Sequence, residues 1–163
     1  MIASCSTPEV FIEEPEAVEP ESSLPAWYNP NTNSSSDHRY FMGFAMSVAS
    51  DSSEAVQTGN ETAIANLRYE IDRFVEEIRE GLVTDGSDVK YNSPTFIIGL
   101  RNAVQQLQLS DSEFDREVEE REDGITHVYT RMAITRTKVI DQMTDLISDE
   151  MFTGALLADR DEP

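Results

Sequence analysis

The sequence contains little cysteine and little histidine. Among its 163 residues there are one cysteine, Cys5, and two histidines, His38 and His127. A single cysteine excludes an internal disulfide framework and any site built from several thiolates. The two histidines lie far apart without a ligand pattern around them. We therefore expect no metal site, with weak calcium binding by acidic clusters left open.

Basic residues are also scarce. Lysine and arginine together number 12 against 32 aspartates and glutamates, which gives a formal net charge of -20, and the only lysines are Lys90 and Lys138. A phosphate backbone needs a basic surface, so the composition argues against a nucleic-acid partner. A salt-rich habitat would favour such a composition, because salt screens the repulsion between surface charges. The alternative is an acidic surface that only maintains solubility.

Long hydrophobic runs and common catalytic motifs are missing too. No apolar run approaches the roughly 20 residues that cross a bilayer, and we find no phosphate-binding glycine loop, zinc-protease motif or nucleophile elbow. Paired carboxylates such as Glu119 and Glu120 could act as acid and base, but close pairs arise by chance among 32 carboxylates. We expect neither an enzyme nor a cofactor. A deep pocket lined by converging carboxylates would revive the enzyme hypothesis.

The chain divides into three parts by composition. Residues 1–23 form an acidic, proline-rich stretch without lysine or arginine, which predicts an extended tether. Residues 24–148 have the apolar patterning of a single domain, and residues 149–163 form a C-terminal extension. We expect Trp27 and Tyr28 to dock on the domain at its beginning, because adjacent aromatic side chains are costly to leave in water.

A strand is predicted over residues 40–48 by a period of two. Most of the large side chains fall on one face and mostly small ones on the other, which would let a helix approach the small face closely. The large face must be covered by another element or by a neighbouring subunit. Its members are Tyr40, Met42, Phe44, Met46 and Val48.

Three helices are predicted by apolar residues spaced three and four apart. The first begins near Ser52 or Ser53 as N-cap and carries two expected i,i+4 ion pairs, Arg68 with Asp72 and Arg73 with Glu77. A second begins at Ser93 and Pro94, which are typical N-cap and first-turn residues. A final helix begins near Thr137.

A hairpin is predicted around Asp123 and Gly124, which readily adopt the backbone angles of a tight turn. His127 would then face an acidic residue such as Glu120, although the register is not readable from the sequence. We therefore expect an α+β fold in the order strand, helix, helix, strand, strand, helix. Its small antiparallel sheet would have helices packed on one face.

The C-terminal extension contains three large apolar residues. We expect them either to dock on the domain or to reach another copy of it. They are Phe152, Leu156 and Leu157.

The segment Ile2-Ala3-Ser4-Cys5 has the pattern of a bacterial lipobox, in which a cysteine after small residues receives a lipid. The acidic tether that follows would carry the domain away from the membrane. Only Met1 precedes this segment, whereas export needs a charged and an apolar region before the lipobox. We expect either a start that lies further upstream or a leader that has been trimmed.

Several segments together resemble a known family. These are LPAW, YFMGFA, AIANLRYEI and HVYTRMAITRTKVIDQM, spread between Leu24 and Ile147. They resemble the small bacterial outer-membrane lipoproteins typified by the Helicobacter lipoprotein antigen, a family similar to the lipoprotein of the flagellar basal disk. The resemblance implies a compact domain on a lipid anchor, with members that self-associate into rings. The acidic stretch from Asp111 to Asp123 departs from that pattern.

Two functional hypotheses follow. The first is a non-catalytic structural protein, anchored to the outer membrane through Cys5 on the periplasmic or exposed side, that self-assembles into a homo-oligomeric ring, sheet or tube. Its expected contact residues are Trp27, Tyr28, the strand face from Tyr40 to Met46 and the three apolar residues of the extension. The second is a periplasmic binding or adaptor module that holds a glycan or protein partner through Trp27 and Tyr28.

Overall fold

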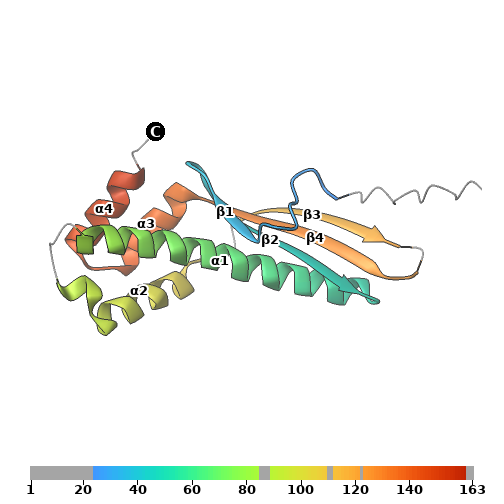
Figure 1. Ribbon diagram of the computed structural model, residues 1–163, viewed down its shortest axis with the longest axis horizontal. Helices are drawn as coiled ribbons and strands as arrows, with labels where there is room; N and C mark the ends of the chain where they lie inside the picture. Colours follow the sequence, from blue (N-terminus) through green and yellow to red (C-terminus); the bar gives the residue numbers. More distant parts are fainter. Residues whose placement is uncertain (1–23, 85–88, 110–111, 122, 161–163) are drawn as a thin grey trace, which may run out of the picture.

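The computed structural model describes residues 24–84, 89–109, 112–121 and 123–160. Cys5 and the expected tether 1–23 lie outside the described residues. Figure 1 shows an elongated molecule with the sheet towards one end and a cluster of helices at the other. In chain order the elements are β1 (Ser34–Ser36), β2 (Tyr40–Ala49), α1 (Ser52–Thr84), η1 (Val89–Asn92), α2 (Pro94–Gln106), β3 (Glu113–Glu120), β4 (Thr126–Thr135), α3 (Arg136–Leu146) and α4 (Glu150–Arg160).

The sheet has four antiparallel strands in the order β1-β2-β4-β3. Its centre is the ladder between β2 and β4, which runs from Tyr40 opposite Thr135 to Ala49 opposite Thr126. The prediction of an α+β fold with a small antiparallel sheet is therefore confirmed. The short edge strand β1, which the sequence did not predict, pairs only with the first half of β2.

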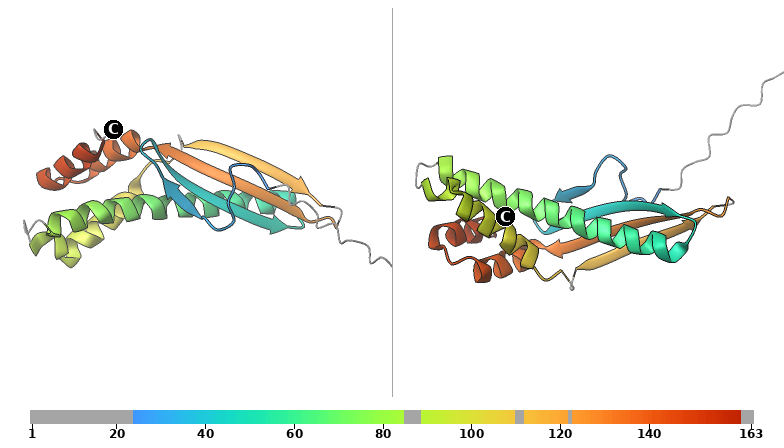
Figure 2. Two further views of the ribbon diagram at one scale, coloured as in Figure 1. Left: turned by 45° about the horizontal axis from the view of Figure 1, so that its top comes forward. Right: turned by 90° about the horizontal axis from the view of Figure 1, so that it is seen from below.

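Helix α1 lies along one face of the sheet, which we call the inner face (Figure 2). The predicted small face of β2 makes this contact possible. A Cβ added at Gly43 would collide with the backbone of Ala63 and Leu67. The apolar stripe of α1 is buried at its centre, where Leu67 and Ile71 have no exposed surface.

Only the first half of α1 covers the sheet. With 33 residues, α1 is about 50 Å long, and its second half packs with η1, α2 and α4 beyond the end of the strands (Figure 1). The core is thus continuous from the sheet into the helical end, and α1 connects the two.

The predicted start of α2 is confirmed, since the Ser93 hydroxyl accepts a hydrogen bond from the Phe96 amide and Pro94 opens the helix. The N-cap of α1 is instead Asp51, whose carboxylate accepts from the Glu54 amide at 2.9 Å. The prediction of Ser52 or Ser53 missed the residue just before them, although all three types are good N-caps.

The two ion pairs expected along α1 are wrong. Arg68 donates instead to the backbone carbonyls of Val104, Gln105 and Leu107, where α2 ends. Arg73 forms its salt bridge with Glu70, one turn earlier, at 2.5 Å. Arg68 thus joins α1 to the end of α2, whereas Arg73 stays within α1 and pairs with the carboxylate that β1 buries. Orphan carbonyls at a helix end and a buried carboxylate attract a guanidinium more than an exposed carboxylate does.

The predicted hairpin is confirmed, with Gly124 at a positive φ of 77° between β3 and β4. Its longer loop sets a register in which His127 pairs with Glu119, whereas Glu120 pairs with Thr126. His127 therefore faces an acidic residue, as expected, but that residue is Glu119, and Glu120 lies on the opposite face.

The C-terminal extension is part of the domain. Helix α4 places Phe152 and Leu156 in the core, each with no exposed surface, and Leu157 packs against the same cluster. Of the two alternatives for this segment, docking on the domain is the one observed. The packed unit accordingly reaches Arg160, beyond the boundary expected at residue 148.

Candidate interaction surface

The outer face of the sheet, opposite α1, is crossed by residues 24–33, which we call the strap. The Tyr28 ring packs against that of Tyr129 with centroids 5.1 Å apart. The Trp27 indole nitrogen donates to Glu117 at 3.2 Å, and the Arg131 guanidinium lies 5.5 Å from the Trp27 ring centroid. Burial and the nearby Tyr129 raise the pKa of Tyr28. The prediction that both aromatic residues dock on the domain is confirmed.

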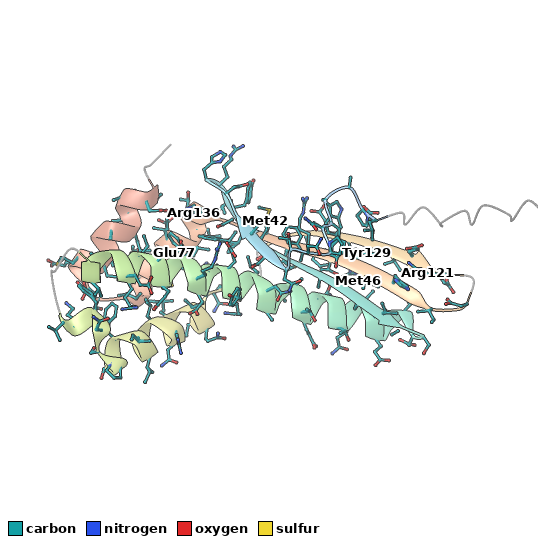
Figure 3. All side chains as sticks on the ribbon, viewed as in Figure 1. Met42, Met46, Glu77, Arg121, Tyr129 and Arg136 are labelled. Atoms are coloured by element: carbon teal, nitrogen blue, oxygen red, sulfur yellow. The ribbon has the colours of Figure 1, made fainter. Side chains whose placement is uncertain are left out.

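The strap covers only part of the large face of β2. Phe44 is buried, and Tyr40 and Met42 are half-buried. Further along the strand Met46 is 46% exposed and Val48 is 48% exposed. Met42 and Met46 can be followed along β2 in Figure 3. Of the two expected alternatives, cover by another element of the same chain holds for Phe44. It does not hold for Met46 and Val48.

The backbone of β2 is open where its side chains are exposed. The ladder with β1 ends at Gly43, and the Phe44 amide then donates to the Asn33 carbonyl at 2.8 Å. In an antiparallel strand every second residue directs its N–H and C=O to the same edge. Met46 and Val48 therefore direct theirs outward as Phe44 does. No other residue in the described ranges pairs with them there.

Strand β3 forms the opposite edge of the sheet. Its inner-face side chains Phe114 and Val118 are 42% and 51% exposed, because α1 packs mainly on β2 and β4. The other face of β3 carries Asp115, Glu117 and Glu119. Such charges on an edge strand hinder pairing with another chain. The β3 edge is therefore protected against pairing with another chain by its charges, whereas the open part of β2 is not.

Three open cavities in the described part of the chain are large enough to hold a ligand. One of about 800 Å³ lies between α1, the end of α2 and α3, and one of about 410 Å³ lies beside Lys90 and Phe96. A third lies along the first turns of α1. Each is lined by one carboxylate: Asp145, Asp149 and Glu61 respectively. None of the three has the converging carboxylates that an acid–base pair needs.

The carboxylates with lowered pKa values serve structural contacts. Burial alone would raise the pKa of Asp149, but hydrogen bonds from Lys90, the Phe152 amide and Tyr91 lower it. Asp149 thereby caps α4 and ties it to η1. The part of the chain that the structure describes holds no cluster of three or more His, Cys, Asp or Glu side chains placed to bind a metal ion.

The sequence-predicted contact residues are thus separated by the structure. Trp27, Tyr28 and the β2 residues come together on the outer face, whereas Phe152 and Leu156 are buried at the helical end. Val48 belongs to the exposed edge but was not among the expected contact residues. The sequence could have indicated it, because Val48 follows Met46 at a spacing of two and so lies on the same face of the strand.

No helix in the described ranges is both long and apolar enough to span a membrane. In comparisons with known proteins, no family model matches this chain, no curated protein matches its sequence and no solved structure matches its fold.

Proposed function

We propose that this protein is a non-catalytic structural protein of the bacterial cell envelope that associates with copies of itself. The observation that supports the proposal best is the open edge of β2, where exposed apolar side chains and outward backbone groups coincide at Met46 and Val48. Globular domains commonly protect such edges with charge, proline or a covering loop. An unprotected edge is a template for pairing with another chain.

The net charge of -20 determines when copies can meet. At low ionic strength the repulsion between two acidic molecules extends over tens of ångströms, whereas at about 1 M salt it falls off within about 3 Å. Self-association should accordingly be weak in dilute buffer and strong in concentrated salt. Ring, sheet and tube are all forms that a repeated contact can produce.

The test is the molar mass in solution as a function of salt and protein concentration. We expect light scattering to report a monomer at about 0.05 M NaCl and larger species at about 1 M NaCl. A chain that stays monomeric at high salt and high concentration would contradict the proposal. Electron microscopy of material from the native membrane then distinguishes a ring from a sheet or tube.

The anchor in the proposal is a lipid on Cys5. It is supported by the lipobox pattern Ile2-Ala3-Ser4-Cys5 and by the resemblance to envelope lipoproteins, and it implies an outer-membrane location, periplasmic or surface-exposed. When the gene is expressed with its native upstream sequence, the protein should partition into detergent and carry the mass of a lipid. The Cys5→Ser variant should lose both properties. Equal partitioning of the two forms would contradict a lipid on this cysteine.

The alternative of a binding or adaptor module stays a prediction with less support. Trp27 and Tyr28 already contact Glu117, Arg131 and Tyr129 of their own chain. A glycan or peptide would have to displace these contacts. Because Trp27 is the only tryptophan, quenching of its fluorescence by cell-wall fragments would favour this alternative.

A further inference from the structure

The opening on β2 has defined ends. It begins at Ala45, because Asn33 occupies the edge opposite Phe44, and it ends at Ala49, where the strand ends. After two intervening residues the chain enters α1 at Ser52 and leaves the plane of the sheet. A partner strand at this edge therefore has residues 45–49 to pair with, and Ser47 lies at their centre.

We propose that the partner is the same segment of a second copy, paired antiparallel across a two-fold axis at Ser47. This inference rests on the proposed self-association and specifies one contact within it, a closed dimer. A ring, sheet or tube would need a second contact between such dimers. The axis places Met46 opposite Val48 of the second copy, and the reverse. Both residues direct their backbone groups outward, so each opposed pair can exchange two N–H···O=C hydrogen bonds. Residues 45–49 of one copy then pair along their whole length with residues 49–45 of the other. Each strand ends at Ala49, before it would collide with Asn33 of the second copy.

Charge selects this edge over the other one. The ten residues of β2 include no charged side chain. Strand β3 carries Asp115, Glu117, Glu119 and Glu120 against one arginine, Arg116, and pairing β3 with itself would bring carboxylates together. For two molecules of net charge -20, the uncharged edge is where close approach meets the least local repulsion.

The flank of α1 beside this edge fits the same arrangement. Asn66 donates to the Phe44 carbonyl at 2.7 Å, which identifies the side of α1 that lies next to the outer edge of β2. Thr62 and Thr58 lie one and two turns before Asn66 on that side, and both are exposed and uncharged, whereas Glu54, one turn earlier still, is exposed and acidic. A two-fold axis perpendicular to the sheet leaves both copies of α1 on one face of a continuous sheet. Their flanks, which are uncharged from Thr58 to Asn66 and carry Glu54 in the first turn, then face each other.

The first experiment compares two glutamate substitutions on opposite edges. Val48→Glu places a carboxylate at both Met46–Val48 contacts of the proposed dimer. Val118→Glu adds the same charge to β3 at a side chain of similar exposure, 51% against 48%. In sedimentation at about 1 M NaCl, where long-range repulsion is screened, we expect Val48→Glu to raise the dimer dissociation constant at least about tenfold. Val118→Glu should change it less than about twofold.

The second experiment fixes the register. In a Cys5→Ser background, Met46→Cys combined with Val48→Cys should yield a covalent dimer on oxidation. Opposed residues in a hydrogen-bonded pair have Cα atoms about 5.5 Å apart, which suits a disulfide. Peptide mapping should find the bond between position 46 of one chain and position 48 of the other. Phe114→Cys with Val118→Cys is the matched control on β3 and should remain monomeric.

The outcomes separate this inference from the proposal on which it rests. If wild type associates in salt and both glutamate variants weaken association equally, or the β3 control cross-links as well, the β2 dimer is wrong while self-association stands. If mapping joins the β2 positions to any other segment, including residues 1–23, the two-fold pairing is overturned. If wild type remains monomeric in salt, both fall. Far-UV circular dichroism and melting curves identical to wild type confirm that each variant is folded.

Discussion

At the scale of single residues, Gly43 and Glu70 show how closely the sheet and α1 are joined. Gly43 is a point of close approach between β2 and α1, and its place in the small face of β2 was readable from the alternation of the sequence. The burial of Glu70 could not be predicted from the sequence. Glu70 is almost fully buried and accepts hydrogen bonds from Ser34 and Ser36 of β1 and from Arg73. A glutamate among many on a helix gives no sign that it will be buried by a strand distant in the sequence.

The contact at Gly43 predicts a large effect of one methyl group. Gly43→Ala should lower the free energy of unfolding by at least about 3 kcal/mol, because the new Cβ would overlap backbone atoms that cannot move independently. Chemical denaturation measures this directly. Gly99→Ala in α2 is the control, since its Cβ would meet nothing within 4 Å, and it should stabilise by about 0.5 to 1 kcal/mol. Equal effects at the two sites would contradict the close approach.

The hydrogen bonds to Glu70 predict a dependence of stability on pH. Although burial alone would raise the pKa of Glu70, bonds from Ser36, Arg73 and Ser34 lower it below its ordinary value of 4.5. Its contribution is therefore fully present above about pH 4.5 and is lost as pH falls through the lowered pKa. Glu70→Gln should cost about 2 kcal/mol at pH 7.

The same variant should also lose less stability than wild type between about pH 5 and pH 3. Denaturation curves across this range test both effects. If the free energy of unfolding falls equally with pH in both proteins, ionised Glu70 does not stabilise the fold. A steeper fall in wild type than in the variant would support the stabilising role.

At the scale of elements, strand β2, helices α1, α2 and α3 and the β3–β4 hairpin were predicted from periodicity and turn residues. Strand β1 was not, because the three serines of Ser34–Ser36 have no apolar alternation and β1 is held by β2 and Glu70. Helix α4 was also missed as a helix. Its burial depends on a surface formed by α1 and α3, which no local pattern within residues 149–163 reveals.

Helix α4 predicts that the C-terminal residues are essential for stability. Phe152→Ala should lower the free energy of unfolding by about 3 to 5 kcal/mol, because it leaves a cavity beside Phe96. Met151→Ala, one residue earlier on the exposed side of the same helix, should change it by less than about 0.5 kcal/mol. Thermal melts of the pair provide the measurement. A Phe152 variant as stable as the Met151 variant would contradict the packing of α4 on the core.

At the scale of the whole molecule, the sequence predicted the large apolar face of β2 but not which part of it stays exposed. The alternation placed Met46 and Val48 together with Tyr40, Met42 and Phe44 on one apolar face. What distinguishes them is the course of the strap, which buries Phe44 and ends before Met46. That course depends on Tyr28 finding Tyr129 across the sheet, a long-range contact that a single sequence does not specify.

The net charge predicts that salt stabilises the fold itself. Raising NaCl from about 0.05 M to about 1 M should increase the melting temperature by several degrees, because screening reduces repulsion within a chain of charge -20. Most of the increase should occur below about 0.5 M, and KCl should act like NaCl. A melting temperature that falls with salt would mean that ion pairs such as Arg136 with Asp159 outweigh the overall repulsion.

The strap also determines how the domain would bear mechanical load. A pull on the chain before Leu24 would first act on the contacts of Trp27 and Tyr28 with the outer face, and then on the three-residue ladder of β1. The long ladder between β2 and β4 and the packing of α1 would be loaded only after the strap had peeled away. If a membrane holds the protein through Cys5, the strap would yield under tension before the core does, and in yielding it would uncover Tyr129 and Phe44.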